Sequence, residues 1–202
     1  MSKGDTTEQP RRQRRAAPRD PDRSRRRILD AAKIRFSHAS FEGAGVRDIA
    51  ADAGVDPALV IRHFGSKEAL FRAIVDSAFG TDDLLADGVA RLASHASELL
   101  LGDWEDGVWQ HDYNPLLLML ASISSPLAGP ILATGLDRDF LAALATALGG
   151  ARSRERSMMI AAQILGLALI RIVASRDGAA PVDRQALAEM LEGTLDNLLR
   201  QS

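Results

Sequence analysis

Residues 46–63 constrain the fold most, because their small and apolar side chains recur at the spacing of two short helices joined by a tight turn. Ala50 is small where the second helix must pass close, and Gly54 stands where the turn requires a positive φ angle. The apolar wedge between the two steeply crossing helices consists of Ile49, Val55 and Val60. The pattern predicts a helix-turn-helix whose second helix can lie in a major groove.

An ordinary corner between two helices of a bundle would show the same spacing. Three further features favour DNA binding. A basic segment lies upstream, a supporting amphipathic helix precedes the pattern, and Lys67 stands at the start of the helix that follows.

The rest of the chain also shows helical spacing, and no stretch alternates long enough to predict a strand. We therefore expect an all-α protein of about nine helices. Ser24 is a suitable cap for the first helix, and Gly129-Pro130 should kink or split the seventh. The expected helices span residues 24–38, 46–53, 57–63, 66–79, 82–101, 113–124, 127–148, 152–175 and 183–200.

Composition narrows the function classes. The 202 residues contain no cysteine, which excludes disulfides, thiolate metal sites and cysteine nucleophiles. The longest apolar stretch, residues 158–170, is too short to span a membrane, and no secretory signal is visible. We expect a cytoplasmic protein that does not bind membranes.

The net charge of −2 is the sum of a basic N-terminal part and an acidic C-terminal part. Residues 1–75 carry 16 basic and 10 acidic groups, or +6, and residues 76–202 carry 9 and 17, or −8. This split predicts a basic DNA-reading head on an acidic body. The expected organisation is a disordered basic arm over 1–23, a helix-turn-helix domain over 24–79, and a helical ligand-binding and dimerisation domain over 80–202.

Three segments carry a family resemblance: Arg27-Ile-Leu-Asp-Ala-Ala with Phe36, Val46-Arg-Asp-Ile-Ala-Ala-Asp-Ala-Gly-Val, and Arg62-His-Phe-Gly-Ser-Lys-Glu-Ala-Leu. Together they resemble the DNA-binding domain of tetracycline-repressor-type (TetR) regulators, in register from residue 24 to about residue 75. Residues 80–202 resemble the family only in length, helical character and helix order. The resemblance implies a homodimeric transcription factor, usually a repressor that a small ligand releases from DNA.

Three positions depart from the family pattern. Ala44-Gly45 replaces the usual Thr or Ser before the second helix, which removes a hydroxyl contact to phosphate. Ile61 replaces a frequent aromatic residue in the recognition helix, and Ser40 replaces a glycine after the first helix. The arginine-rich arm could compensate for the lost phosphate contacts.

The candidate DNA-binding residues lie on the recognition helix and beside it. Arg47 and Lys67 are expected to contact phosphates, and Arg62 is the long donor suited to a guanine. Leu59 or Ile61 could meet a thymine methyl group, whereas a structural or phosphate-contact role for His63 is as plausible as base reading. The full set is Arg47, Ala58, Leu59, Ile61, Arg62, His63 and Lys67.

The body holds a second candidate site. Both tryptophans and the single tyrosine fall in one short stretch, which suggests a wall of a ligand cavity. Core filling near a loop explains the same cluster equally well. The candidate ligand-binding residues are Trp104, Trp109, Tyr113, Met119 and Phe140. No catalytic constellation or metal-ligand spacing is present, so we expect neither an enzyme nor a cofactor, and the effector is an unknown small molecule.

The last two helices, about 152–176 and 183–200, carry apolar stripes that suggest a homodimer built as a four-helix bundle. The first stripe contains Met159, Ala162, Gly166, Leu169 and Val173, and the second contains Leu187, Met190, Leu191, Leu195 and Leu198. The sequence thus predicts a ligand-responsive, homodimeric repressor of a palindromic operator. An activator, or a helical small-molecule-binding or scaffold protein without specific DNA binding, remains the alternative.

Overall fold

A computed structural model describes residues 21–81, 85, 87–102, 113–174 and 182–200. Within these ranges the chain is helical and contains no strand, which confirms the all-α prediction. None of the described helices is both long and apolar enough to cross a membrane.

The N-terminal head consists of four helices around an aliphatic and aromatic core. They are α1 (Pro21–His38), α2 (Val46–Asp52), α3 (Pro57–Phe64) and α4 (Lys67–Val75). Phe36, Phe41 and Phe71 are fully buried and contact one another, with ring centroids 5.1 to 5.7 Å apart. This aromatic cluster fixes α1 and α4 on either side of the α1–α2 loop.

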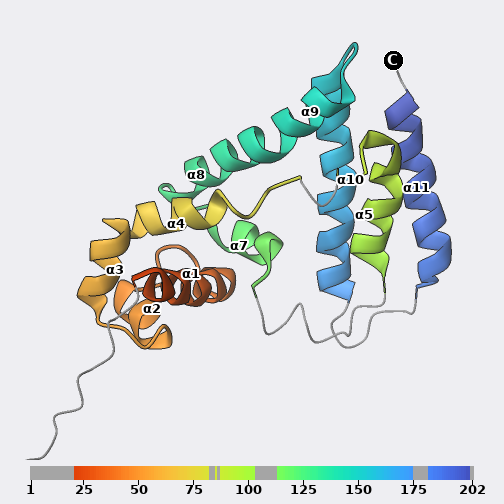
Figure 1. The fold of residues 1–202 in the computed structure, drawn as a ribbon. Helices are drawn as coiled ribbons and strands as arrows, with labels where there is room; N and C mark the ends of the chain where they lie inside the picture. The colour runs from red at the N-terminus through yellow and green to blue at the C-terminus, as the bar shows by residue number, and fades with distance from the viewer. Residues whose placement is uncertain (1–20, 82–84, 86, 103–112, 175–181, 201–202) are drawn as a thin grey trace, which may run out of the picture.

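The body contains two groups of helices (Figure 1). In the first, α8, η2 and α9 follow one another end to end above α4, and α7 lies against α1. In the second, α10 and α11 run alongside α5. The bounds are η1 Val89–Arg91, α5 Leu92–Leu101, α7 Pro115–Ser122, α8 Ala128–Gly135, η2 Leu136–Leu141, α9 Ala142–Leu148, α10 Ser153–Ala174 and α11 Arg184–Arg200.

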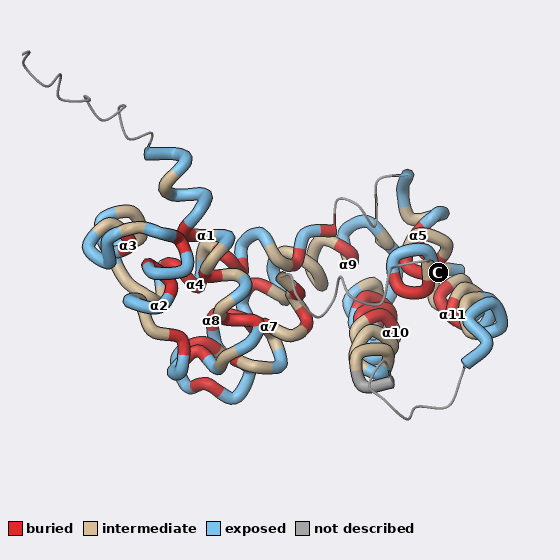
Figure 2. The backbone as a smooth tube through the Cα atoms, turned by 90° about the horizontal axis from the view of Figure 1, so that it is seen from below, coloured by how far each residue is buried: buried red, intermediate tan, exposed pale blue. Residues whose placement is uncertain are grey.

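Two buried clusters hold these groups together (Figure 2). The first joins the head to α7 and α8, so that Leu118 and Ile131 share a core with Ile28 and Phe71. The second lies between α5, α9, α10 and α11. Phe140 packs against both clusters and thereby connects them.

Helix boundaries in the head differ from expectation at two places. Helix α1 begins at Pro21, so Ser24 lies inside the helix and does not cap it. Proline is well tolerated in a first turn, and Asp22 there favours the helix dipole. Helix α4 ends at Val75 rather than Phe79, where the hydroxyl of Ser77 donates to the Ile74 carbonyl oxygen at 2.9 Å and competes with helical hydrogen bonding.

Two predictions for the body were also wrong in detail. Residues 82–84 and 86 of the helix expected from residue 82 lie outside the described residues, and the described part becomes helical at Val89, after Gly88 with a φ angle of +80° that a helix cannot contain. The expected break at Gly129-Pro130 is absent, since Pro130 lies in the first turn of α8, where no intrahelical donor is lost. The irregularity comes later, as the π-helical turn η2.

The apolar stripe predicted on the last helix points into its own protomer. Leu191 and Leu195 of α11 are buried in the second core cluster, and Leu187 and Leu198 pack against it. The exposed face of α11 carries other residues, among them Met190, which is 70% exposed.

Candidate nucleic-acid interface

The turn between α2 and α3 has the geometry that its sequence predicts. Gly54 has a φ angle of +61°, in the left-handed region that glycine occupies without steric cost. A Cβ atom there would also lie 2.5 Å from Nη2 of Arg27. Ile49, Ala50 and Val60 are buried, as expected for the wedge between two crossing helices.

Both ends of α3 are capped. Asp56 accepts a hydrogen bond from the Ala58 backbone N–H at 2.8 Å, and Pro57 occupies the first helical position. Gly65 ends the helix with a φ angle of +82°. Ser66 then caps α4 by accepting from the Ala69 N–H at 3.1 Å. These caps fix the length and direction of α3 independently of any ligand.

Helix α3 presents a mixed face to solvent. Ala58, Ile61 and Arg62 are exposed, and Leu59 and His63 are half-buried. Ile61 keeps 46% of its surface accessible, so its apolar side chain is available for contact with a partner. Arg62 forms no ion pair or hydrogen bond with the part of the chain that the structure describes. An exposed apolar side chain beside a free guanidinium is a combination that could contact base edges in a major groove.

The two residues expected at phosphates come before and after α3 in the chain. Arg47 is exposed on α2, and Lys67 is half-buried at the first position of α4. The ammonium of Lys67 stands 4.5 Å from the ring centroid of Phe41 and 3.5 Å from the carbonyl oxygen of Glu42. Lys67 is therefore held by the α1–α2 loop, with donors remaining for an anion.

Helix α2 begins without a side-chain cap. Gly45 occupies the N-cap position and supplies no side-chain hydrogen bond, and Ala44 before it is fully buried. A Cβ atom at Gly45 would lie 2.7 Å from Oδ2 of Asp48. The hydroxyl that family members place here is therefore absent, and Asp48 lies over the glycine.

Sequence reasoning missed the contacts by which α1 holds α2 and α3, which are here called the reading unit. The guanidinium of Arg25 stacks over the ring of Phe64 at 5.2 Å, which ties the start of α1 to the end of α3. Arg35 donates from Nε to Oδ2 of Asp52 at 2.9 Å and ties the end of α1 to α2. The residues of each pair are far apart in the sequence, so no local spacing pointed to them.

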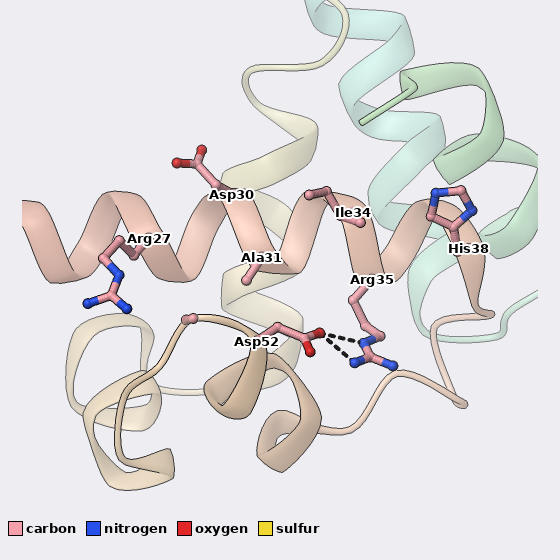
Figure 3. Close-up of a pocket in the computed structure, with 8 residues that line it drawn as sticks. Arg27, Asp30, Ala31, Ile34, Arg35, His38 and Asp52 are labelled. Atoms are coloured by element: carbon pink, nitrogen blue, oxygen red, sulfur yellow. Dashed lines mark hydrogen bonds and ion pairs between the residues drawn. The ribbon is translucent and has the colours of Figure 1, made fainter. Parts of the chain in front are cut away.

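An open groove runs beside α1, and the Arg35–Asp52 pair forms part of its lining (Figure 3). Arg27 lies at one end of the groove and His38 at the other, and the Arg35–Asp52 ion pair lies between them. It contains none of the predicted ligand-binding residues. Its lining residues are Arg27, Asp30, Ala31, Ile34, Arg35, His38, Asp52 and Ala53. Among the described residues, no group of three or more His, Asp or Glu could hold a metal ion.

The predicted ligand-binding residues fall into two sets. Trp104 and Trp109 lie outside the described residues. Tyr113, Met119 and Phe140 are half-buried and pack against the first core cluster. The Lys33 ammonium lies 5.1 Å from the Tyr113 ring centroid, so this ring contacts α1, and burial raises the pKa of its hydroxyl. A ligand role for these residues stays a prediction.

Comparison with known proteins identifies related chains. The family model described as bacterial regulatory proteins of the tetR family matches residues 28–74, and a tetracyclin repressor-like C-terminal domain matches residues 91–199. The regulatory protein RaaS of Mycobacterium tuberculosis is 45% identical over 69 residues, which are 34% of this chain and 31% of RaaS. The repressor AcnR of Corynebacterium glutamicum is 35% identical over 83 residues, or 41% of this chain and 39% of AcnR. The matched segments thus span about a third of the curated relatives.

Solved structures extend the similarity to the whole fold. NalD, the secondary repressor of the MexAB-OprM multidrug efflux pump in Pseudomonas aeruginosa, superposes with a TM-score of 0.65 at 20% identity, covering 91% of this chain and 100% of NalD. A TetR-family regulator of Streptomyces coelicolor gives a TM-score of 0.54 at 26% identity, covering 91% of this chain and 99% of that one. From its head to its last helix, this chain belongs to the TetR family of bacterial transcriptional regulators.

Proposed function

We propose that the protein is a cytoplasmic, homodimeric repressor that binds a palindromic operator and leaves it when a small effector binds. Residues 1–23 would be a basic arm, 24–79 the DNA-reading domain, and 80–202 the effector-binding and dimerisation domain. The observation that carries this proposal is the exposed face of α3, which presents Ile61 and an unpaired Arg62 on a helix capped at both ends.

The DNA contacts follow from the chemistry of this face. Arg62 can donate two parallel hydrogen bonds to a guanine, and Ile61 with Ala58 can meet thymine methyl groups. Arg47 and Lys67 neutralise phosphates and set the register of α3 along the groove. Leu59 and His63 are half-buried and contribute at the edges of the contact.

A mobility-shift assay with the DNA upstream of the protein's own gene tests the proposal. We expect a specific complex that survives excess random duplex, and a footprint with two half-sites about 34–36 Å apart or a multiple of that distance. Binding that random duplex removes completely would contradict specific DNA recognition.

The dimer is proposed to form through α10 and α11. Met159, Ala162, Gly166 and Ile170 are exposed on one face of α10, and Ile170 is 61% exposed. The exposed face of α11 adds Met190 and Gly193. Small residues between large apolar ones let two helices approach closely, and a second copy offers the same surface. Sedimentation at low micromolar concentration should give twice the protomer mass of 21.7 kDa.

The effector is proposed to bind in the body beside Tyr113, Met119 and Phe140, with Trp104 and Trp109 contributing from the preceding segment. Phe140 contacts both core clusters, so a molecule against it would act on the head and the body together. Because both tryptophans of the chain belong to this set, an effector should change the intrinsic tryptophan fluorescence. An effector that leaves the fluorescence unchanged but releases DNA would contradict this placement.

A second candidate is a helical small-molecule-binding or scaffold protein without specific DNA binding. The bare start of α2 favours it, because Gly45 offers no hydroxyl to a phosphate. The mobility-shift assay separates the two candidates. Transcription in vitro from the bound promoter then separates a repressor, which lowers transcript yield, from an activator.

A further inference from the structure

The loop between α1 and α2 holds Lys67 in place. Phe41 is buried among the head aromatics and presents its ring to the Lys67 ammonium at 4.5 Å. The next residue, Glu42, turns its carbonyl oxygen toward the same ammonium at 3.5 Å. The position of the lysine charge therefore depends on where residues 41 and 42 lie.

The same loop is fastened to the body by a different group. The hydroxyl of Ser125 donates to Oε1 of Glu42 at 2.5 Å, a bond between residues 83 positions apart. This hydroxyl also accepts hydrogen bonds from the backbone N–H of Ala128 at 3.0 Å and of Leu127 at 3.3 Å, where α8 begins. Ser125 is only 5% exposed, so its geometry is fixed by the start of α8.

The charge on Glu42 suits this arrangement. The hydrogen bond from Ser125 is the largest cause that lowers the pKa of its carboxyl group, and Lys67 lowers it further. The carboxylate is thus ionised at neutral pH, and a hydrogen bond to an ionised acceptor is shorter and stronger than one between neutral groups.

We propose that Glu42 and Ser125 are positioning residues for Lys67, and that they form a connection from the start of α8 to a DNA-backbone contact. This connection crosses the α1–α2 loop and does not pass along α4. A displacement of the first turn of α8 would move Ser125 and then Glu42. The lysine ammonium would lose its place at the phosphate. The inference rests on the proposed function, in which Lys67 contacts DNA.

The test measures binding to a fluorescent random-sequence duplex of about 30 base pairs as a function of potassium chloride concentration, because no operator is needed to count phosphate contacts. Each phosphate neutralised contributes about 0.9 to the slope of log K against log salt. Lys67→Met should lower the slope by about that amount per protomer. Ser125→Ala should lower it in the same direction, although it changes no charge.

Two companion variants guard against a simple folding defect. Ser125→Ala also removes the acceptor for the Leu127 and Ala128 N–H groups at the start of α8. Glu42→Asp keeps that acceptor and the charge but shortens the side chain, so it no longer reaches Ser125. Ser125→Ala and Glu42→Asp should each reduce the slope, whereas Ser125→Thr, which keeps a hydroxyl at this position, should retain the full slope. Neither Ser125→Ala nor Glu42→Asp should reduce the slope further in a Lys67→Met background. Thr134→Ala is the matched control, because that hydroxyl bonds only the Pro130 carbonyl of its own helix.

The outcomes separate the two proposals. If Lys67→Met lowers the slope but Ser125→Ala and Glu42→Asp keep the full value, the positioning role is wrong and DNA binding stands. If Lys67→Met keeps the full slope, Lys67 makes no phosphate contact and the positioning role of Glu42 and Ser125 is wrong. The proposed DNA binding then rests on other residues. If the unaltered protein binds no duplex at low salt, the proposed function itself is wrong.

Discussion

The guanidinium of Arg156 on α10 donates from Nε to the carbonyl oxygen of Leu198 on α11 at 2.9 Å. Its Nη2 donates to the carbonyl of Leu199 at 3.0 Å, and Nη1 donates to that of Gly149 at 3.1 Å. All three acceptors are backbone oxygens at the ends of α9 and α11, where carbonyl groups lack helical partners. A cation that is only 7% exposed is thus held by the negative ends of two helices.

Replacing Arg156 with Met should destabilise the protein by about 2–4 kcal/mol, because three partly buried acceptors lose their donors together. The unfolding free energy of Arg156→Lys should lie between those of the unaltered protein and Arg156→Met, since one ammonium cannot reach all three carbonyls. Urea unfolding followed by circular dichroism, at one fixed protein concentration, measures the difference. Arg154→Met is the control on the same helix, because its exposed ion pair with Asp137 should contribute less than about 1 kcal/mol. Equal losses for the two variants would contradict the capping role.

The close crossing of α4 and α8 depends on Gly135. A Cβ atom there would overlap Cγ1 of Val75, and Phe79 lies next to it. Gly135→Ala should therefore cost about 1–3 kcal/mol in unfolding free energy through overpacking. Adding Val75→Ala should recover part of this loss, so the double variant costs less than the sum of the two single variants. Thr134→Ala, on the exposed side of α8, should change stability by less than about 0.5 kcal/mol.

Arg138 gives the stability of the protein a predictable dependence on pH. Its Nε donates to Oδ1 of Asp139 at 2.6 Å, and Nη2 donates to Oδ1 of Asp76 at 2.7 Å, which joins η2 to the end of α4. The hydrogen bond from Arg138 lowers the pKa of Asp139 below its ordinary value of 3.8. The folded state therefore favours the ionised carboxylate, and the unfolded chain takes up protons first as the pH falls.

The stabilisation from Asp139 should be complete above pH 3.8 and should disappear as the pH falls through the lower folded-state pKa. Unfolding free energies measured between about pH 6 and pH 2.5 should show this acid loss, and Arg138→Met should make it shallower. Arg91→Met, which removes an exposed arginine from η1, should leave the slope unchanged. If the unfolding free energy of Arg138→Met fell with pH as steeply as that of the unaltered protein, the Arg138–Asp139 pair would not contribute to acid sensitivity.

The reading unit of the head was predictable from the sequence because its determinants are local. Gly54, Asp56-Pro57 and the spacing of Ile49 to Val60 each act within a few residues, and the structure places all of them as predicted. The pairs that fix this unit in the molecule are Arg25 with Phe64 and Ser125 with Glu42. They join distant positions, and no periodicity carries that information.

In the body, the packing partners of the helices could not be predicted from local sequence. Its helices were predicted, but Leu191 and Leu195 were assigned to a dimer face because a stripe of leucines looks the same whether its partner is α5 or a second copy. The π-helical turn η2 was missed for a related reason. Residues 136–141 contain no glycine or proline that would indicate an irregularity, and the π-helical turn lies where Gly135 approaches α4 closely and Arg138 is paired with Asp76.

The proposed dimer makes Gly166 a sensitive position. In the protomer, nothing lies within 4 Å of where its Cβ would be, so Gly166→Glu should leave the fold of a single chain intact. In a close contact between two α10 helices the added carboxylates would be buried against each other. Sedimentation should then show a shift from the dimer to a 21.7 kDa monomer. Thr146→Glu on the exposed side of α9 should remain dimeric, and a dimeric Gly166→Glu would place the interface elsewhere.

Arg62 should determine sequence preference, whereas Arg47 should determine only affinity. Arg62→Ala removes the exposed long donor of α3, so discrimination at one base pair per half-site should fall by about 1–3 kcal/mol, and random-duplex binding should change little. Arg47→Ala removes a phosphate contact, so it should weaken specific and random duplexes alike and lower the salt slope by about 0.9 per protomer. Competition binding with operator variants at fixed salt measures both effects. Arg91→Ala in the body is the control for lost positive charge, and a uniform loss of affinity in Arg62→Ala would assign Arg62 to the backbone instead of the bases.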